Sequence, residues 1–126
     1  MKKVIATPEA PKAVGPYSQA VAVGNFLFCA GQIPLDPATG ELVEGDATAQ
    51  TERVLQNVAA VLRANGMTFD NVVKSTVFMV DLGKFADMNA VYSKYFSTPF
   101  PARSTIQVAA LPKGAQVEIE VIAITG

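Results

Sequence analysis

A stretch of eighteen residues, from Tyr95 to Pro112, contains a single charged side chain, that of Arg103. A guanidinium stays protonated at any working pH, so the fold must accommodate this charge wherever the chain places it. A charge withdrawn from water is costly unless an acceptor meets it, and the planar fork of arginine fits a carboxylate or a phosphate. Either another part of the chain or a ligand must therefore supply the acceptor for Arg103.

The chain has few charged residues for a small domain that stands alone. Hydrophobic residues make up 50% of its 126 residues and charged residues 17%, against a usual charged share of about 25%. Because a small domain has much surface relative to its volume, the apolar excess predicts burial at subunit interfaces and hence a homo-oligomer. A monomer with an apolar surface is the alternative. The length predicts one domain over residues 1–126.

Charge and residue types exclude several kinds of chemistry. The net charge is −1 and no basic run exceeds Lys2–Lys3, so we expect no nucleic-acid partner. The absence of histidine removes histidine-dependent nucleophiles and histidine-ligated metals. Acid–base chemistry must then come from Glu, Asp, Lys, Tyr or water. No spacing typical of a metal site, a phosphate loop or a cofactor fingerprint occurs.

The single cysteine, Cys29, cannot form an internal disulfide, which indicates a reducing compartment. The first residues lack an apolar core of signal-peptide length, and no segment approaches the length of a membrane span. We therefore expect a cytoplasmic protein without a membrane partner.

The pattern of apolar residues predicts the order strand-strand-strand-helix-strand-helix-strand-strand. A helix is expected from its N-cap Asp46 to about Asn65, before Gly66, and a second from residue 83 or 84 to the prolines at 99 and 101. The strands are expected at residues 4–6, 18–23, 26–30, 71–80, 102–109 and 117–124. This order predicts an α+β fold with both helices on one face of a mixed sheet, and subunit association covering the other face. The unbroken apolar run at 26–30 suits a strand covered on both faces.

Each of the last two predicted strands has one polar side. Because side chains alternate across a strand, Arg103, Thr105 and Gln107 share one face, and Glu118 and Glu120 share one face of the final strand. If these strands pair with their polar sides together, Arg103 lies near a glutamate. The simpler interpretation is then an internal Arg–Glu salt bridge at an interface. The functional one leaves Arg103 free to bind a ligand carboxylate while a glutamate activates water, with two close carboxylates raising the pKa of one of them.

Four other residues are weaker candidates. Tyr17 follows the turn at Gly15–Pro16, where a tyrosine usually serves packing. Gly31 would allow a close approach to a ligand, although a glycine at the end of a strand is common. Cys29 is expected to be a small buried hydrophobe and not a nucleophile. Asn89 is expected at the surface or in a local hydrogen bond.

Taken together, five segments resemble the RidA/YjgF family of enamine and imine deaminases. In chain order they read AVGPYSQA (13–20), CAGQIP (29–34), VKSTVF (73–78), FPARS (100–104) and LPKG (111–114) leading into VEIE (117–120). The resemblance runs nearly end to end. It implies a chorismate-mutase-like α+β fold and a homotrimer whose sheets form a central barrel, with three clefts between subunits.

The resemblance also implies an activity. The family hydrolyses 2-aminoacrylate or its imine tautomer 2-iminopropanoate, and 2-iminobutanoate, to 2-keto acids and ammonia. These reactive intermediates escape from pyridoxal-phosphate dehydratases that act on serine or threonine. By position, Arg103 would bind the substrate carboxylate and Glu118 would hold the attacking water. The cleft would be lined by Tyr17 of the neighbouring subunit, by backbone groups near Gly31 and Thr105, and at its margin by Asn89.

Two positions depart from the family pattern. Ala30 stands where many members have serine, which removes one hydroxyl contact, and Thr105 stands where many have cysteine. The second change is mild if the contact is made by the backbone. Both bear on substrate preference more than on the type of reaction.

The implied reaction agrees with the residues present. An imine carbon is already electrophilic, so orientation of the carboxylate and one ordered water can supply much of the acceleration without a metal or cofactor. Two alternatives remain open. The first alternative to the deaminase is a module that binds small 2-keto acids without turnover. The second is an endoribonuclease or translation inhibitor, activities attributed to some relatives. The acidic pI and the lack of a basic face argue against the last.

Overall fold

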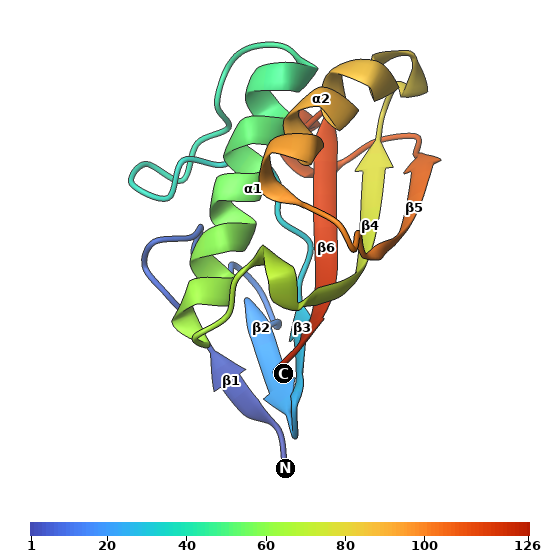
Figure 1. Cartoon of the computed structure of the whole chain (residues 1–126). Coiled ribbons are helices and arrows are strands. Elements are labelled where there is room, and N and C mark those ends of the chain that lie inside the picture. Colours follow the sequence, from blue (N-terminus) through green and yellow to red (C-terminus); the bar gives the residue numbers. More distant parts are fainter.

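The computed structural model describes all 126 residues, and six strands form one mixed sheet in the order β1-β2-β3-β6-β4-β5 (Figure 1). The strands are β1 (Lys3–Ile5), β2 (Ala20–Val23), β3 (Phe26–Cys29), β4 (Val72–Met79), β5 (Ala102–Gln107) and β6 (Val117–Ile124). The helices α1 (Ala47–Ala64) and α2 (Phe85–Tyr95) cover the same face of the sheet. Single 3₁₀ turns lie at Phe69–Asn71, Leu82–Lys84 and Pro112–Gly114. The predicted α+β class and element order are confirmed.

The first helix begins and ends where the sequence predicts. The Asp46 carboxylate accepts a hydrogen bond from the Ala49 N–H at 3.0 Å, which satisfies one of the free donors of the first turn. Gly66 has a φ of +69°, a backbone conformation that glycine adopts without strain and that ends a helix. Between them, apolar residues at helical spacing are buried, including Val54, Leu55, Val58, Val61 and Leu62.

The core lies between the helices and one face of the sheet. On β6, Val117, Ile119 and Val121 are at most 2% exposed, together with Val77 of the neighbouring β4. Glu118 and Glu120 point to the opposite face, as the alternation along residues 117–124 predicts. The position of Glu118 therefore follows from the burial of its two neighbours in the core.

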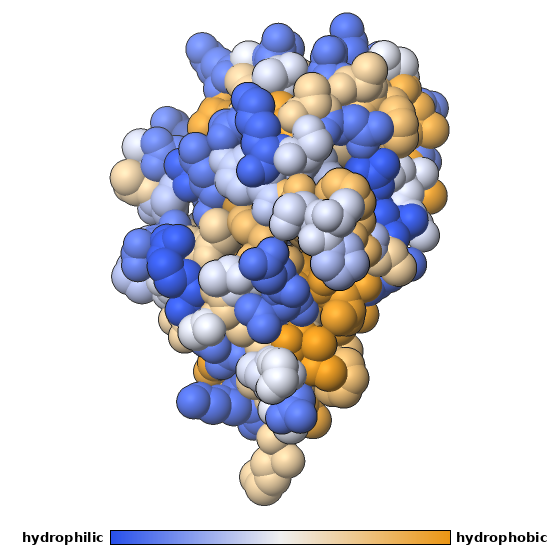
Figure 2. All heavy atoms as spheres, in the orientation of Figure 1, coloured by the Kyte–Doolittle hydropathy of each residue, from blue (hydrophilic) through white to orange (hydrophobic).

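The opposite face of the sheet, which we call the open face, has no covering layer within the chain. It exposes large apolar side chains on β1, β2, β3 and β5: Val4, Val23, Phe26, Phe28 and Ile106. Within the single chain, the run at 26–30 is covered on one face only. Only Leu27 and Cys29 face the helices there, and Phe28 is 45% exposed. In Figure 2, hydrophobic residues gather along one margin of the molecule, beside the lower ends of β3 and β6.

The last two strands do not pair with each other. β4 lies between them, parallel to β5 and antiparallel to β6. Arg103 is opposite Ser75, which faces the helices, whereas Glu118 is opposite Phe78 on the open face. Arg103 and the glutamates therefore lie on opposite faces of the sheet, and the condition for a shared polar side is not met within one chain. The crossover through α2 joins β4 to the parallel β5, which forms the edge of the sheet beside β4.

Neither helix combines the length and the apolar composition that crossing a membrane requires.

Candidate functional site

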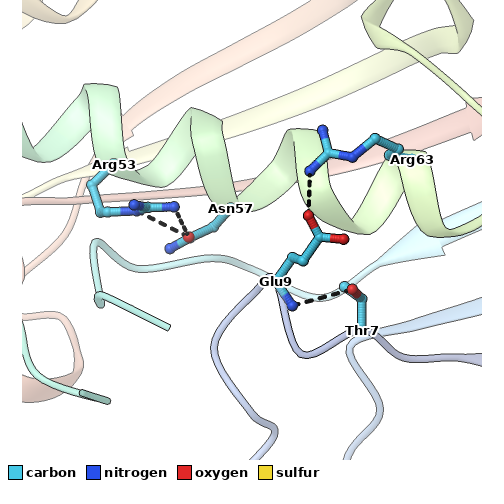
Figure 3. A network of polar contacts seen from close by, with 5 residues as sticks. All are labelled: Thr7, Glu9, Arg53, Asn57 and Arg63. Atoms are coloured by element: carbon cyan, nitrogen blue, oxygen red, sulfur yellow. Dashed lines mark hydrogen bonds and ion pairs between the residues drawn. The ribbon is translucent and has the colours of Figure 1, made fainter. Parts of the chain in front are cut away.

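The guanidinium of Arg103 packs against aromatic rings of α2 and has no acidic partner. Its Cζ lies 4.7 Å from the centre of the Tyr92 ring and 5.5 Å from that of Phe85. The ion pair that the chain does form joins Arg63 to Glu9, at 3.2 Å on the surface (Figure 3). Cation–π contacts of this kind contribute about 0.5–2 kcal/mol each, and no carboxylate of the chain meets the fork. Arg103 therefore forms no Arg–Glu salt bridge within the single chain.

A cavity of about 330 Å³ opens beside this guanidinium. Its size lies at the lower end of the range for small-molecule sites, about 300–1,000 Å³. It is lined by Asn89, Tyr92, Ser93, Phe100, Pro101 and Arg103. Phe100 is 58% exposed, so this wall of the cavity stands free in the single chain. The arrangement offers one fixed positive charge to a small anion with a modest apolar part.

Tyr92 is held in place from two sides. Its hydroxyl lies 2.7 Å from the Ser75 hydroxyl, and Ser75 is fully buried on β4. Its ring stacks on Phe96 with the two centroids 4.1 Å apart. Burial raises the pKa of Tyr92, while the hydrogen bond from Ser75 and the charge of Arg103 oppose that rise. Tyr92 is therefore a neutral, fixed surface beneath the guanidinium.

On the open face, the carboxylate of Glu118 lies directly against the backbone of Gly31. A Cβ atom built on Gly31 would stand 2.0 Å from Oε2 of Glu118 and 2.8 Å from its Cδ, so only glycine leaves room for this side chain. The backbones of Gln32 and Ile119 hold the two segments together with a pair of hydrogen bonds of 2.9 and 3.1 Å. The N–H of Gly31 makes no hydrogen bond within the chain.

This environment makes Glu118 a stronger base than a surface glutamate. Burial raises its pKa, and the negative charge of Glu120 on the same face of β6 raises it further. A carboxylate with a raised pKa that is partly exposed can accept a proton from water more readily than an ordinary glutamate and return it later.

The other residues predicted from the sequence lie at different places in the structure. Asn89 lines the cavity beside Arg103. Tyr17 is 54% exposed and lines a different cavity of about 610 Å³, formed with the N-terminal segment. The hydroxyl of Thr105, on the same strand as Arg103, is buried without a hydrogen-bond partner. Burial raises the pKa of Cys29 to about 12, which agrees with its prediction as a hydrophobe and not a nucleophile.

Comparison with known proteins identifies the family. The family model described as Endoribonuclease L-PSP matches residues 7–125. The solved structure of RidA from the Antarctic bacterium Psychrobacter sp. PAMC 21119 superposes with a TM-score of 0.94 at 49% identity, covering 98% of this chain and 99% of that chain. The chain belongs to the RidA/YjgF family.

Curated relatives of this RidA/YjgF chain carry different names. Protein DfrA of Myxococcus xanthus is 56% identical over 126 residues, covering 98% of this chain and 96% of the relative. The 2-iminobutanoate/2-iminopropanoate deaminase of Bos taurus is 48% identical over 126 residues, covering all of this chain and 92% of the relative.

Sequence reasoning missed three side chains of this RidA/YjgF chain. Tyr92 lies beneath the Arg103 guanidinium, Ser75 is within hydrogen-bond distance of Tyr92, and Asn57 donates to the carbonyls of the loop that follows Gly31. Both Ser75 and Asn57 are fully buried. A polar residue within an otherwise apolar strand or helix face was the available signal, because a buried polar group must find a partner.

Proposed function

We propose that this chain is an imine deaminase, which hydrolyses 2-iminopropanoate (the tautomer of 2-aminoacrylate) and 2-iminobutanoate to 2-keto acids and ammonia. The observation that carries the proposal is Arg103, a guanidinium that lines a cavity and has no carboxylate partner in the chain. The carboxylate of the substrate would supply the bidentate acceptor that the fork lacks. The name of the bovine relative, 2-iminobutanoate/2-iminopropanoate deaminase, supports the same activity.

In this proposal Glu118 handles the protons of the reaction. Water attacks the carbon of the protonated imine, a C–O bond forms, and the electron pair of the C=N bond moves to nitrogen. Glu118 takes a proton from the water and returns it to the nitrogen. It then takes the proton of the new hydroxyl group while the O–H electron pair forms the C=O bond, the C–N bond breaks and ammonia leaves with the C–N electron pair. The raised pKa of Glu118 suits these transfers near neutral pH. Arg103 holds the substrate throughout and supplies orientation.

We further propose that each site forms between two copies of the chain. Arg103 and Glu118 lie on opposite faces of one sheet, so no small substrate can reach both within a single chain. The apolar open face also needs a cover. In a homotrimer with the open faces turned toward a central barrel, the β5 edge of one copy would bring its Arg103 to the Glu118 of the next. A head-to-tail interface of this kind closes into a ring.

The other predicted residues take supporting roles in this arrangement. Gly31 would keep the carboxylate of Glu118 in place and offer its free N–H to substrate. Asn89 would line the substrate cavity, and Thr105 would contact substrate through its backbone. Tyr17 lies away from the Arg103 cavity of its own chain, so it would reach the cleft of a neighbouring copy.

A coupled assay tests the activity. A serine or threonine dehydratase generates the imine, and semicarbazide traps what remains after increasing amounts of the protein are added. We expect faster loss of the trappable imine and stoichiometric ammonia. Glu118→Ala should abolish turnover while 2-keto acids still bind, because Arg103 is retained. Binding of keto acids without turnover by the wild-type protein would support the binding module instead, and cleavage of RNA that Arg103→Ala abolishes would support the endoribonuclease.

A further inference from the structure

We propose that Asn57 is a positioning residue, which fixes the segment from Gly31 to Leu35 on α1 and thereby keeps Gly31 against the carboxylate of Glu118. The inference rests on the proposed function for its kinetic consequence. It concerns a residue on the far side of the sheet from Glu118, which touches neither substrate nor the reacting atoms.

Asn57 is fully buried in the middle of α1, and every polar atom of its amide is used. Its Nδ2 donates to the carbonyl oxygen of Ile33 at 3.2 Å and to that of Leu35 at 3.0 Å. Its Oδ1 accepts two hydrogen bonds from Arg53, from Nε at 3.1 Å and Nη2 at 2.8 Å (Figure 3). The charged donor fixes which way the amide faces, so the N–H₂ group must point at the loop.

The loop that Asn57 holds is the one that meets Glu118. The paired hydrogen bonds of Gln32 with Ile119 attach the start of the loop to β6, one residue after Glu118. The bonds from Asn57 attach the continuation of the loop to α1. The backbone at Gly31 is thus supported from both layers of the fold. Its contact with Glu118 is close enough that one added methyl group would overlap the carboxylate.

Loss of the Asn57 donors should therefore act on Glu118 through the loop. Two loop carbonyls would lose their buried partner, and the segment would have to move toward water to satisfy them. A loop that moves away exposes the Glu118 carboxylate, and burial is the main cause of its raised pKa. A displacement of about 1 Å at a catalytic group costs up to about 100-fold in rate.

Few other groups can act on the titration of Glu118, and in the proposed oligomer Arg103 of the neighbouring copy is one of them. Glu120, on its own strand, is the neighbouring charge. On β4, Phe78 lies opposite Glu118 and Thr76 opposite Glu120, and neither of these titrates. Lys74, opposite Ile122, is the next ionisable residue along β4. None of these groups lies on the loop or on α1, so changes at Asn57 leave them in place.

The test compares Asn57→Asp with the matched control Arg63→Ala in the full-length protein. Asn57→Asp keeps the size of the side chain and its acceptor for Arg53, but replaces the donor with an oxygen that faces two carbonyls. Arg63→Ala removes an exposed ion pair elsewhere on α1 (Figure 3). We expect Asn57→Asp to lower kcat about 10- to 100-fold with KM within about threefold of wild type, because Arg103 is untouched. The control should retain both constants.

Carboxyl NMR titration of Glu118 in the ligand-free protein provides the second readout. We expect its pKa to fall toward the ordinary glutamate range in Asn57→Asp and to stay raised in Arg63→Ala. A variant that loses stability yet keeps wild-type kcat overturns the positioning role, and so does an unchanged titration. If the wild-type protein does not hydrolyse the imine, the proposed function is wrong. The titration of Glu118 would still decide whether Asn57 positions the loop. If Asn57→Asp does not fold, Asn57→Ser removes the amide donors to the loop without adding a charge and serves the same two measurements.

Discussion

Gly31→Ala adds one methyl group at the point where the backbone meets the Glu118 carboxylate. The new Cβ would stand 2.0 Å from Oε2, whereas real Cβ contacts almost never fall under 3.0 Å. The carboxylate must therefore retreat by about 1 Å or more. The φ of Gly31 lies outside the left-handed region, so alanine fits the backbone. Gly31→Ala should change the free energy of unfolding only slightly, because the stabilisation that comes from a less flexible unfolded chain is about 0.4–1 kcal/mol.

A displacement of this size should be visible in turnover. A misplacement of about 1 Å at a reacting group costs about 100-fold in rate, or about 2.7 kcal/mol of transition-state stabilisation. The loss should appear in kcat, because the cavity beside Arg103 lies on the other face of the sheet. The raised pKa of Glu118 should fall as its carboxylate moves out toward water.

The dehydratase-coupled assay measures this loss, with thermal unfolding as the check on the fold. Gly83→Ala is a matched control, since its Cβ would also meet a carboxylate oxygen, that of Asp81 at 2.9 Å, and this carboxylate has no role in the site. The control should retain wild-type kcat. A Gly31→Ala protein with wild-type unfolding temperature and a kcat within about twofold of wild type would refute the reasoning.

Substitutions at four further positions test other parts of the site. Arg103→Lys keeps the charge but loses the planar fork, so kcat/KM should fall about 10- to 100-fold while the oligomer stays intact in sedimentation analysis. Tyr92→Phe keeps the ring beneath the guanidinium and loses the hydrogen bond with Ser75, so it should lower the free energy of unfolding by only about 1 kcal/mol. Tyr92→Leu also removes the ring beneath Arg103 and should raise KM about threefold or more. Glu120→Gln removes the charge that helps raise the pKa of Glu118, so the acidic limb of the pH–rate profile should move to lower pH. At pH values above the raised pKa of Glu118, Glu118→Gln should raise the unfolding temperature. At pH values below the ordinary glutamate range it should leave the unfolding temperature unchanged, because the folded state binds this proton more tightly than the unfolded state.

The parts of the fold that the sequence predicts correctly are those determined locally. Asp46 and Gly66 delimit α1 because a cap and a left-handed glycine act over one turn of helix. The alternation around Glu118 predicts its face because the period of a strand is two residues. The same rule places Arg103 and Thr105 together on one face of β5.

The partners of these residues depend on long-range pairing, which a single sequence does not encode in any local pattern. β4 lies between β5 and β6, so Arg103 and Glu118 face away from each other although the polar sides of their strands were predicted correctly. The exposure of Phe28 likewise depends on what covers the sheet beyond the chain. Tyr92 and Asn57 gain their roles from contacts across 11 and more than 20 residues of sequence, with Arg103 and with the loop carbonyls.

The central claim is that Arg103 of one copy and Glu118 of another make one site, and complementation between two inactive variants tests it most directly. Arg103→Ala and Glu118→Gln proteins are unfolded together in equal amounts, refolded, and assayed for imine hydrolysis. With random mixing in a closed head-to-tail ring, about a quarter of the sites would receive both wild-type residues, so about a quarter of wild-type activity per chain should return. Mixed oligomers that remain as inactive as either parent would contradict the account.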